Sequence, residues 1–228
     1  MKTKRFIFTA LIITVFAVMF MTACNMVLHE QEPKKEKQVE AVSKPGTPST
    51  VTATAASSSS ITLSWTAAPG ATGYKVYRSS TSSSSGYTDL GSKTPPFTDT
   101  GLSAGTAYYY KVIAYNSAGD GPESSAVSET TAPDAPTGVT AAASVSSITL
   151  SWTAVPGATG YRVYRNTIDS HSETEMIDTP ASTSYTDTSL AAGTPYFYRV
   201  TAYNNAGESP KSSPAIIIGI GNKSLLGQ

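Results

Sequence analysis

One stretch of 18 residues occurs twice in this chain with only two differences. ITLSWTAAPGATGYKVYR occupies residues 61–78, and ITLSWTAVPGATGYRVYR occupies residues 148–165. The tryptophans of the two copies, Trp65 and Trp152, lie 87 residues apart. This spacing is the size of a complete small domain and is much longer than the repeat of a solenoid. The sequence therefore predicts two similar domains, each with a core of its own.

The repeated stretch has the two-residue period of a half-buried β-strand. Ile61, Leu63 and Trp65 alternate with Thr62 and Ser64, so the apolar side chains share one face of an extended segment. A turn signal, PGATG, follows in both copies. The chain also holds 13 Tyr, a residue enriched in strands, and only 14% of its residues are charged. We expect an all-β protein.

Several spaced motifs in each copy carry a family resemblance. Beside the tryptophan stands Gly-Tyr-x-Val-Tyr-Arg, and a Leu precedes a Tyr by six positions, as Leu102 with Tyr108 and Leu190 with Tyr196. Tyr-x-Val-x-Ala-x-Asn follows in both copies. Each copy resembles a fibronectin type III domain.

The resemblance implies two consecutive seven-stranded immunoglobulin-like sandwiches, at residues 46–132 and 133–218, followed by a C-terminal tail at 219–228. It also implies structural roles for four residues. Trp65 and Trp152 would pack in the cores, and Tyr108 and Tyr196 would each close a tyrosine corner. Ile216 to Ile218 are expected to complete the last strand of the second domain.

The N-terminus has the pattern of a secretory signal. Basic residues among the first five positions precede an apolar run over residues 6–21, and Ala23 then precedes Cys24, the only cysteine. This resembles a bacterial lipoprotein signal, although Met21 stands where that signal usually has Leu. We expect a signal peptide at 1–23 and a lipid on Cys24. The alternatives are an uncleaved membrane anchor and a buried thiol.

Residues 24–45 mix glutamates and lysines and have no apolar period, which is typical of a flexible charged tether. The expected product is exported and anchored by its lipid in the bacterial cell envelope, either facing the periplasm or on the cell surface. The membrane is then one partner, and a protein or polysaccharide ligand is the other.

Charge and composition argue against two classes of function. The 16 basic side chains equal the 16 acidic ones, and three of the basic ones lie in the signal, so no basic stripe for nucleic acid is expected. With two histidines and one cysteine, no catalytic set can be assembled, and we expect neither enzymatic activity nor a cofactor.

One weak metal candidate lies in the second domain. Acidic and imidazole side chains stand at alternate positions of one segment: Asp169, His171, Glu173 and Glu175. On an extended chain they would point to one side and could hold a divalent ion. The alternative is an ordinary polar loop.

Aromatic side chains are expected on the outward face of the strands that carry the family motifs. They are Tyr77, Tyr109, Tyr115, Tyr164, Phe197 and Tyr203. Such rings can stack on sugars or anchor a protein. The alternative is that they are cross-strand pairs partly covered by Lys and Arg stems, as neighbouring strands often have.

These features favour a non-catalytic binding or spacer module for protein or cell-surface interaction, anchored by lipid. The alternative is a polysaccharide-binding accessory module that works beside glycoside-degrading enzymes.

Overall fold

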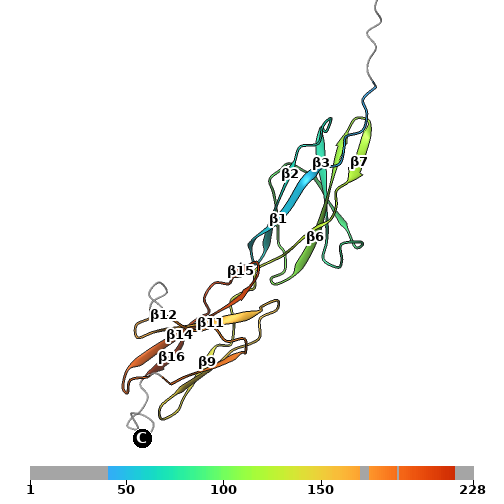
Figure 1. Cartoon of the computed structure of the whole chain (residues 1–228). Coiled ribbons are helices and arrows are strands. Elements are labelled where there is room, and N and C mark those ends of the chain that lie inside the picture. Colours follow the sequence, from blue (N-terminus) through green and yellow to red (C-terminus); the bar gives the residue numbers. More distant parts are fainter. Residues whose placement is uncertain (1–40, 170–174, 189, 219–228) are drawn as a thin grey trace, which may run out of the picture. The chain divides into compact units, whose positions relative to one another are not determined.

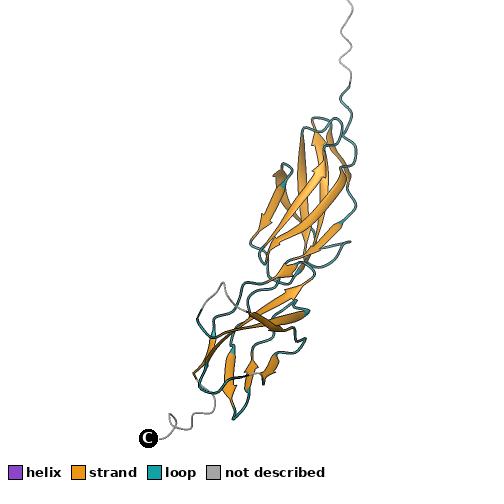
Figure 2. Cartoon of the chain, turned by 60° about the vertical axis from the view of Figure 1, so that its left-hand side comes forward, coloured by secondary structure: helices purple, strands orange, loops and turns teal. Residues whose placement is uncertain are grey.

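The computed structural model describes residues 41–169, 175–188 and 190–218. Every regular element in these ranges is a β-strand, as Figures 1 and 2 show. The all-β prediction is therefore confirmed. The signal, Cys24 and most of the tether lie outside the described residues, as does the tail at 219–228. Within the described ranges, no helix has the length and apolar character needed to span a membrane.

The first domain is a sandwich of two antiparallel sheets. Its strands are β1 (Ser49–Ser57), β2 (Ser60–Thr66), β3 (Gly73–Ser79), β4 (Thr88–Lys93), β5 (Phe97–Thr100), β6 (Ala107–Asn116), β7 (Gly119–Glu123) and β8 (Val127–Thr130). One sheet has the order β1-β2-β5, and the other has β4-β3-β6-β7 with β8 also on β6. The chain thus crosses from one sheet to the other after β2, after β4 and after β5, as in a fibronectin type III sandwich.

The second domain repeats this topology. Its strands are β9 (Thr140–Ala143), β10 (Ile148–Ser151), β11 (Gly160–Asn166), β12 (Glu175–Asp178), β13 (Ser184–Asp187), β14 (Pro195–Asn204), β15 (Gly207–Glu208) and β16 (Ala215–Ile218). The sheets have the orders β13-β10-β9 and β12-β11-β14-β15, with β16 also on β14. The isoleucine-rich segment does complete the last strand of this sandwich.

The seventh strand of each sandwich is divided into two segments, β7 with β8 and β15 with β16. Between β7 and β8, the Ser124 amide donates to Val112 O, while the Ser124 hydroxyl accepts from Val112 N. Ser212 forms the same pair of bonds with Val200. A side-chain hydroxyl replaces a backbone carbonyl here, so the ladder continues across a local break.

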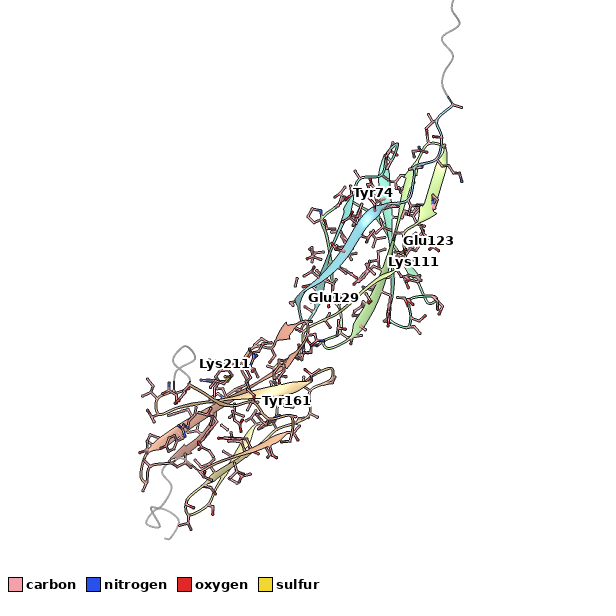
Figure 3. The ribbon with its side chains drawn as sticks, in the orientation of Figure 1. Tyr74, Lys111, Glu123, Glu129, Tyr161 and Lys211 are labelled. Atoms are coloured by element: carbon pink, nitrogen blue, oxygen red, sulfur yellow. The ribbon has the colours of Figure 1, made fainter. Side chains whose placement is uncertain are left out.

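Each core is filled by the alternating apolar residues of the inner strand faces. Ile61, Leu63 and Val76 have no exposed surface, and neither do Ile148 and Leu150. Trp65 packs edge-on against Tyr74 with ring centres 5.5 Å apart, and Trp152 meets Tyr161 at 5.4 Å. Figure 3 labels Tyr74 and Tyr161 in their two domains. Such edge-to-face pairs add to the stabilisation that burial supplies.

Candidate functional site

The predicted aromatic face lies on the sheet that contains β3 and β6 in the first domain and β11 and β14 in the second. In register, Tyr77 lies opposite Lys111, and Tyr164 lies opposite Arg199. All six aromatic residues are half-buried, so none of them is a freely exposed platform. What covers them differs between the domains.

In the first domain, Tyr115 packs against the strand across from it. A Cβ at Gly73 would lie 2.5 Å from the Tyr115 ring, so only glycine permits this approach. Lys75 Nζ lies 5.7 Å from the centre of the same ring and 2.7 Å from Asp120 Oδ2. Asp120 is on β7. The ring is held by a cation that is itself paired with a carboxylate.

The other first-domain rings lie beside a second ion pair. Lys111 Nζ is 3.1 Å from Glu123 Oε2 and 4.8 Å from the centre of the Tyr87 ring. Figure 3 shows Lys111 and Glu123 on this sheet. Tyr77 lies opposite Asp89 on β4, and burial, followed by the charge of that carboxylate, raises the pKa of Tyr77. Tyr109 lies in register between Ser79 and Ser128.

In the second domain, Glu208 is the centre of a hydrogen-bond network. Tyr164 Oη donates to Glu208 Oε1 at 2.7 Å, Thr201 Oγ1 donates to the same oxygen at 2.6 Å, and Arg162 bonds to Oε2. Burial opposes ionisation of Glu208, but the hydrogen bonds from Thr201 and Tyr164 and the charge of Arg162 outweigh it and lower its pKa. Arg162 also lies over the Tyr203 ring, 4.9 Å from its centre. Three polar partners thus fix this carboxylate.

The buried Arg199 lies at the position of Lys111. Its Nη2 is 2.7 Å from Asp169 Oδ1, and its side chain is 2% exposed. Lys211 Nζ lies over the Tyr164 ring at 4.7 Å, and Phe197 is half-buried between Asn166 and Ile216. Two of the three rings of this domain, Tyr164 and Tyr203, are thus covered by cations of the same domain.

The metal candidate is only partly within the described residues. Asp169 pairs with Arg199, and Glu175 Oε2 lies 3.9 Å from Arg165 Nη2. His171 and Glu173 lie outside the described residues. Among the residues that are described, no group of three potential ligands gathers.

The two tyrosine corners have the geometry that the family resemblance implies. The Ser103 amide donates to Tyr108 Oη at 2.9 Å, and the Ala191 amide donates to Tyr196 Oη at 2.8 Å. Each bond ties a strand to the loop that enters it. Both rings are buried, at 6% exposure.

Sequence reasoning missed a buried charged cluster that occurs in both domains. Asp99 accepts from Tyr110 Oη at 2.9 Å and from Arg78 Nη1 at 3.1 Å. Asp187 accepts from Tyr198 Oη at 2.8 Å and from Arg165 Nη1 at 2.9 Å. The available signal was a Thr-Asp-Thr in each copy, 11 residues before the tyrosine. Burial, and then the hydrogen bond to Asp99 or Asp187, raises the pKa of Tyr110 and Tyr198.

A pocket of about 390 Å³ lies at one end of the first domain, where β4 passes into β5. Ten residues line it: Thr72, Gly73, Tyr74, Ser92, Lys93, Thr94, Pro96, Phe97, Thr98 and Tyr115. Lys93 Nζ lies over the Phe97 ring, 5.0 Å from its centre. Sequence reasoning missed this pocket, because its residues come from three separate parts of the chain.

Comparisons with known proteins agree with the topology. The model of the fibronectin type III domain matches residues 46–131 and 134–218. Exoglucanase B of Cellulomonas fimi is 36% identical over 76% of this chain and 16% of its own length. Chitinase A1 of Niallia circulans is 35% identical over 76% of this chain and 26% of its own length.

Among solved structures, a two-domain fibronectin type III segment of chicken tenascin covers 75% of this chain and 98% of its own, with 21% identity and a TM-score of 0.46. The chain spans about a quarter or less of the length of the two enzymes that it resembles. The family match itself includes most of the chain, over both sandwiches. The chain belongs to the fibronectin type III family.

Proposed function

We propose that this is an exported, lipid-anchored protein of the bacterial envelope whose two fibronectin type III domains form a non-catalytic binding or spacer module for protein or cell-surface interaction. The observation that carries this is the tandem of family domains after a lipoprotein-like N-terminus. The covered sheet faces support the spacer role, since Tyr115, Tyr164 and Tyr203 each lie under a cation of their own domain.

The described residues offer no catalytic centre. The chain's two histidines and its cysteine lie outside these residues, and the buried carboxylates Asp99 and Asp187 are each held by an arginine and a tyrosine. A general base needs access to the substrate proton, and these two carboxylates are enclosed between sheets. Asp99 and Asp187 are therefore not available to act as general bases.

Fractionation of a bacterium that expresses the full chain tests the anchoring. We expect the protein in the membrane fraction, resistant to a carbonate wash, with a mature N-terminus at acylated Cys24. A Cys24→Ser variant should lose the acyl chains and the lipid-modified N-terminus. Recovery of an unmodified wild-type chain that still begins at Met1 would overturn the lipoprotein assignment.

A second candidate function is an accessory module for polysaccharides. The specific observation is that relatives named exoglucanase and chitinase match over 76% of this chain. Co-sedimentation of the full chain with cellulose and chitin tests it directly. If the sheet face acts, replacing Tyr77, Tyr109 and Tyr115 by Ala should weaken retention; unchanged retention would exclude that face.

A further inference from the structure

The pocket at the β4–β5 end of the first domain contains a cation without a carboxylate partner. Lys93 ends β4, is half-buried, and lies over Phe97. Among the residues that the structure describes, no carboxylate lies within ion-pair distance of its ammonium group. By contrast, Lys75 and Lys111 of the same domain are each paired with a carboxylate. Lys93 therefore has capacity for an anion from outside the chain.

Apolar and hydroxyl groups surround this lysine in an arrangement suited to a sugar. Phe97, Pro96 and Tyr115 line the pocket and offer flat surfaces for the C–H groups of a pyranose ring. The Thr94 hydroxyl is exposed and forms no hydrogen bond within the described residues. Ser92 Oγ and Tyr115 Oη share one hydrogen bond of 3.1 Å and keep further capacity. Aromatic walls with a few convergent polar groups are typical of small-ligand sites.

We propose that this pocket binds a carboxylate-bearing sugar residue, a uronic acid, of an acidic polysaccharide. Its carboxylate would pair with Lys93, its ring would lie against Phe97 and Tyr115, and its hydroxyls would bond to Thr94 and Ser92. The inference rests on the second candidate function and deepens it by naming the substrate class and the site.

The second domain has no equivalent cation, which makes it an internal control. In the first domain Lys93 lies opposite Tyr74, whereas in the second the Tyr161 amide donates to Pro180 O at 2.9 Å. Proline thus occupies the lysine position. The proposal requires one site per chain, in the first domain only.

Titration calorimetry of the full-length chain in mild detergent tests the proposal with trigalacturonate as the probe. We expect saturable binding at one site, weakened about tenfold or more by Lys93→Gln, because a charge-assisted hydrogen bond is lost. Methyl-esterified trigalacturonate keeps the rings but lacks the charges, and it should bind as weakly. Lys44→Gln removes an exposed lysine outside the pocket and should change the affinity by less than about twofold.

Three outcomes would overturn the pocket assignment: equal binding by Lys93→Gln, equal binding of the methyl ester, or tighter binding of triglutamate, which carries the same number of carboxylates on a peptide. Retention on cellulose or chitin with no trigalacturonate binding would overturn the pocket and leave the accessory function standing. If the chain bound no polysaccharide but carried acylated Cys24, both the pocket assignment and the accessory function would be wrong. The lipid-anchored spacer function would then remain. Matching thermal unfolding of the variants and the wild type shows that each variant is folded.

Discussion

The two domains have nearly the same core but different outer sheet faces. Lys75 lies opposite Ile113 in the first domain, whereas the corresponding Arg162 lies opposite Thr201 in the second. The threonine adds a hydroxyl that donates to Glu208, so a simple ion pair becomes a four-residue network. Core positions are constrained by close packing, while face positions can change if their charges remain paired.

A charge reversal between the copies shows how such a change is compensated. Glu123 pairs with Lys111, but Lys211 holds the position of Glu123 in the second domain. Arg199, at the Lys111 position, pairs instead with Asp169 from the segment after β11. In the second domain a different segment supplies the carboxylate, because a buried guanidinium needs a counter-charge.

The largest expected effect is shared by both domains. Asp99→Ala and Asp187→Ala each leave a half-buried arginine and a buried tyrosine hydroxyl without their acceptor, which should lower the free energy of unfolding of that domain by about 3 kcal/mol. Each domain has one tryptophan, so urea titration followed by fluorescence in a Trp152→Phe or Trp65→Phe background reports one domain at a time.

Asp89→Asn is the control for this experiment, because Asp89 is exposed on the same domain as Asp99. Its effect should stay below about 0.5 kcal/mol. If one buried aspartate proved much less important than the other, the two clusters would not be equivalent.

Alkaline pH should also act on both domains alike. The pKa values of Tyr110 and Tyr198 are raised above that of an unfolded tyrosine, so their stabilising contribution is complete below about pH 10 and falls as the pH rises further, by about 1.4 kcal/mol per pH unit for each tyrosine. Urea titrations at pH 9, 10 and 11 measure this slope. Tyr110→Phe should reduce the slope of the first domain alone, by about 1.4 kcal/mol per pH unit. A slope that this substitution leaves unchanged would show that Tyr110 does not cause it.

Loss of the charge at Glu208 should destabilise the second domain more than the equivalent change destabilises the first. Glu208→Gln removes the charge that Arg162 pairs with and should destabilise the second domain by about 1 kcal/mol at pH 7. Asp120→Asn in the first domain should have a smaller effect, because the Asp120 carboxylate is more exposed than that of Glu208 and is better screened by solvent.

The lowered pKa of Glu208 gives this difference a pH dependence. Its contribution is complete above the ordinary pKa of glutamate and is lost as the pH falls through the lowered value. The gap between wild type and Glu208→Gln should therefore close at acid pH. A gap that is constant from pH 7 to pH 3 would mean that shape, and not charge, stabilises this site.

The smallest expected effect tests the charge reversal. Lys211→Glu gives the second domain the carboxylate that Glu123 provides in the first. Asp169→Asn should then lower the free energy of unfolding less than it does in the wild type, with a coupling energy of about 0.5 kcal/mol. A double-mutant cycle measured by urea unfolding gives this number. Zero coupling would show that Arg199 does not respond to position 211.

Sequence patterns predicted the two sandwiches and their cores, because alternation is a property of each strand by itself. Ile61, Leu63 and Trp65 are buried as their period requires. The sequence placed the six aromatic residues on the correct strands, but it could not predict which side chains cover their rings. Which cation lies over Tyr115 or Tyr203 depends on register with strands that are far away in sequence.

The sequence by itself determined that the chain folds as two fibronectin type III sandwiches, since the repeat, the strand period and the turn signals are all local. Only the tertiary structure decided that Asp99 meets Arg78 and Tyr110, that Glu208 gathers three donors, and that Lys93 stands unpaired beside Phe97. These contacts join residues of different strands. They arise when the two sheets close on each other, because only then do burial and register fix which charges are neighbours.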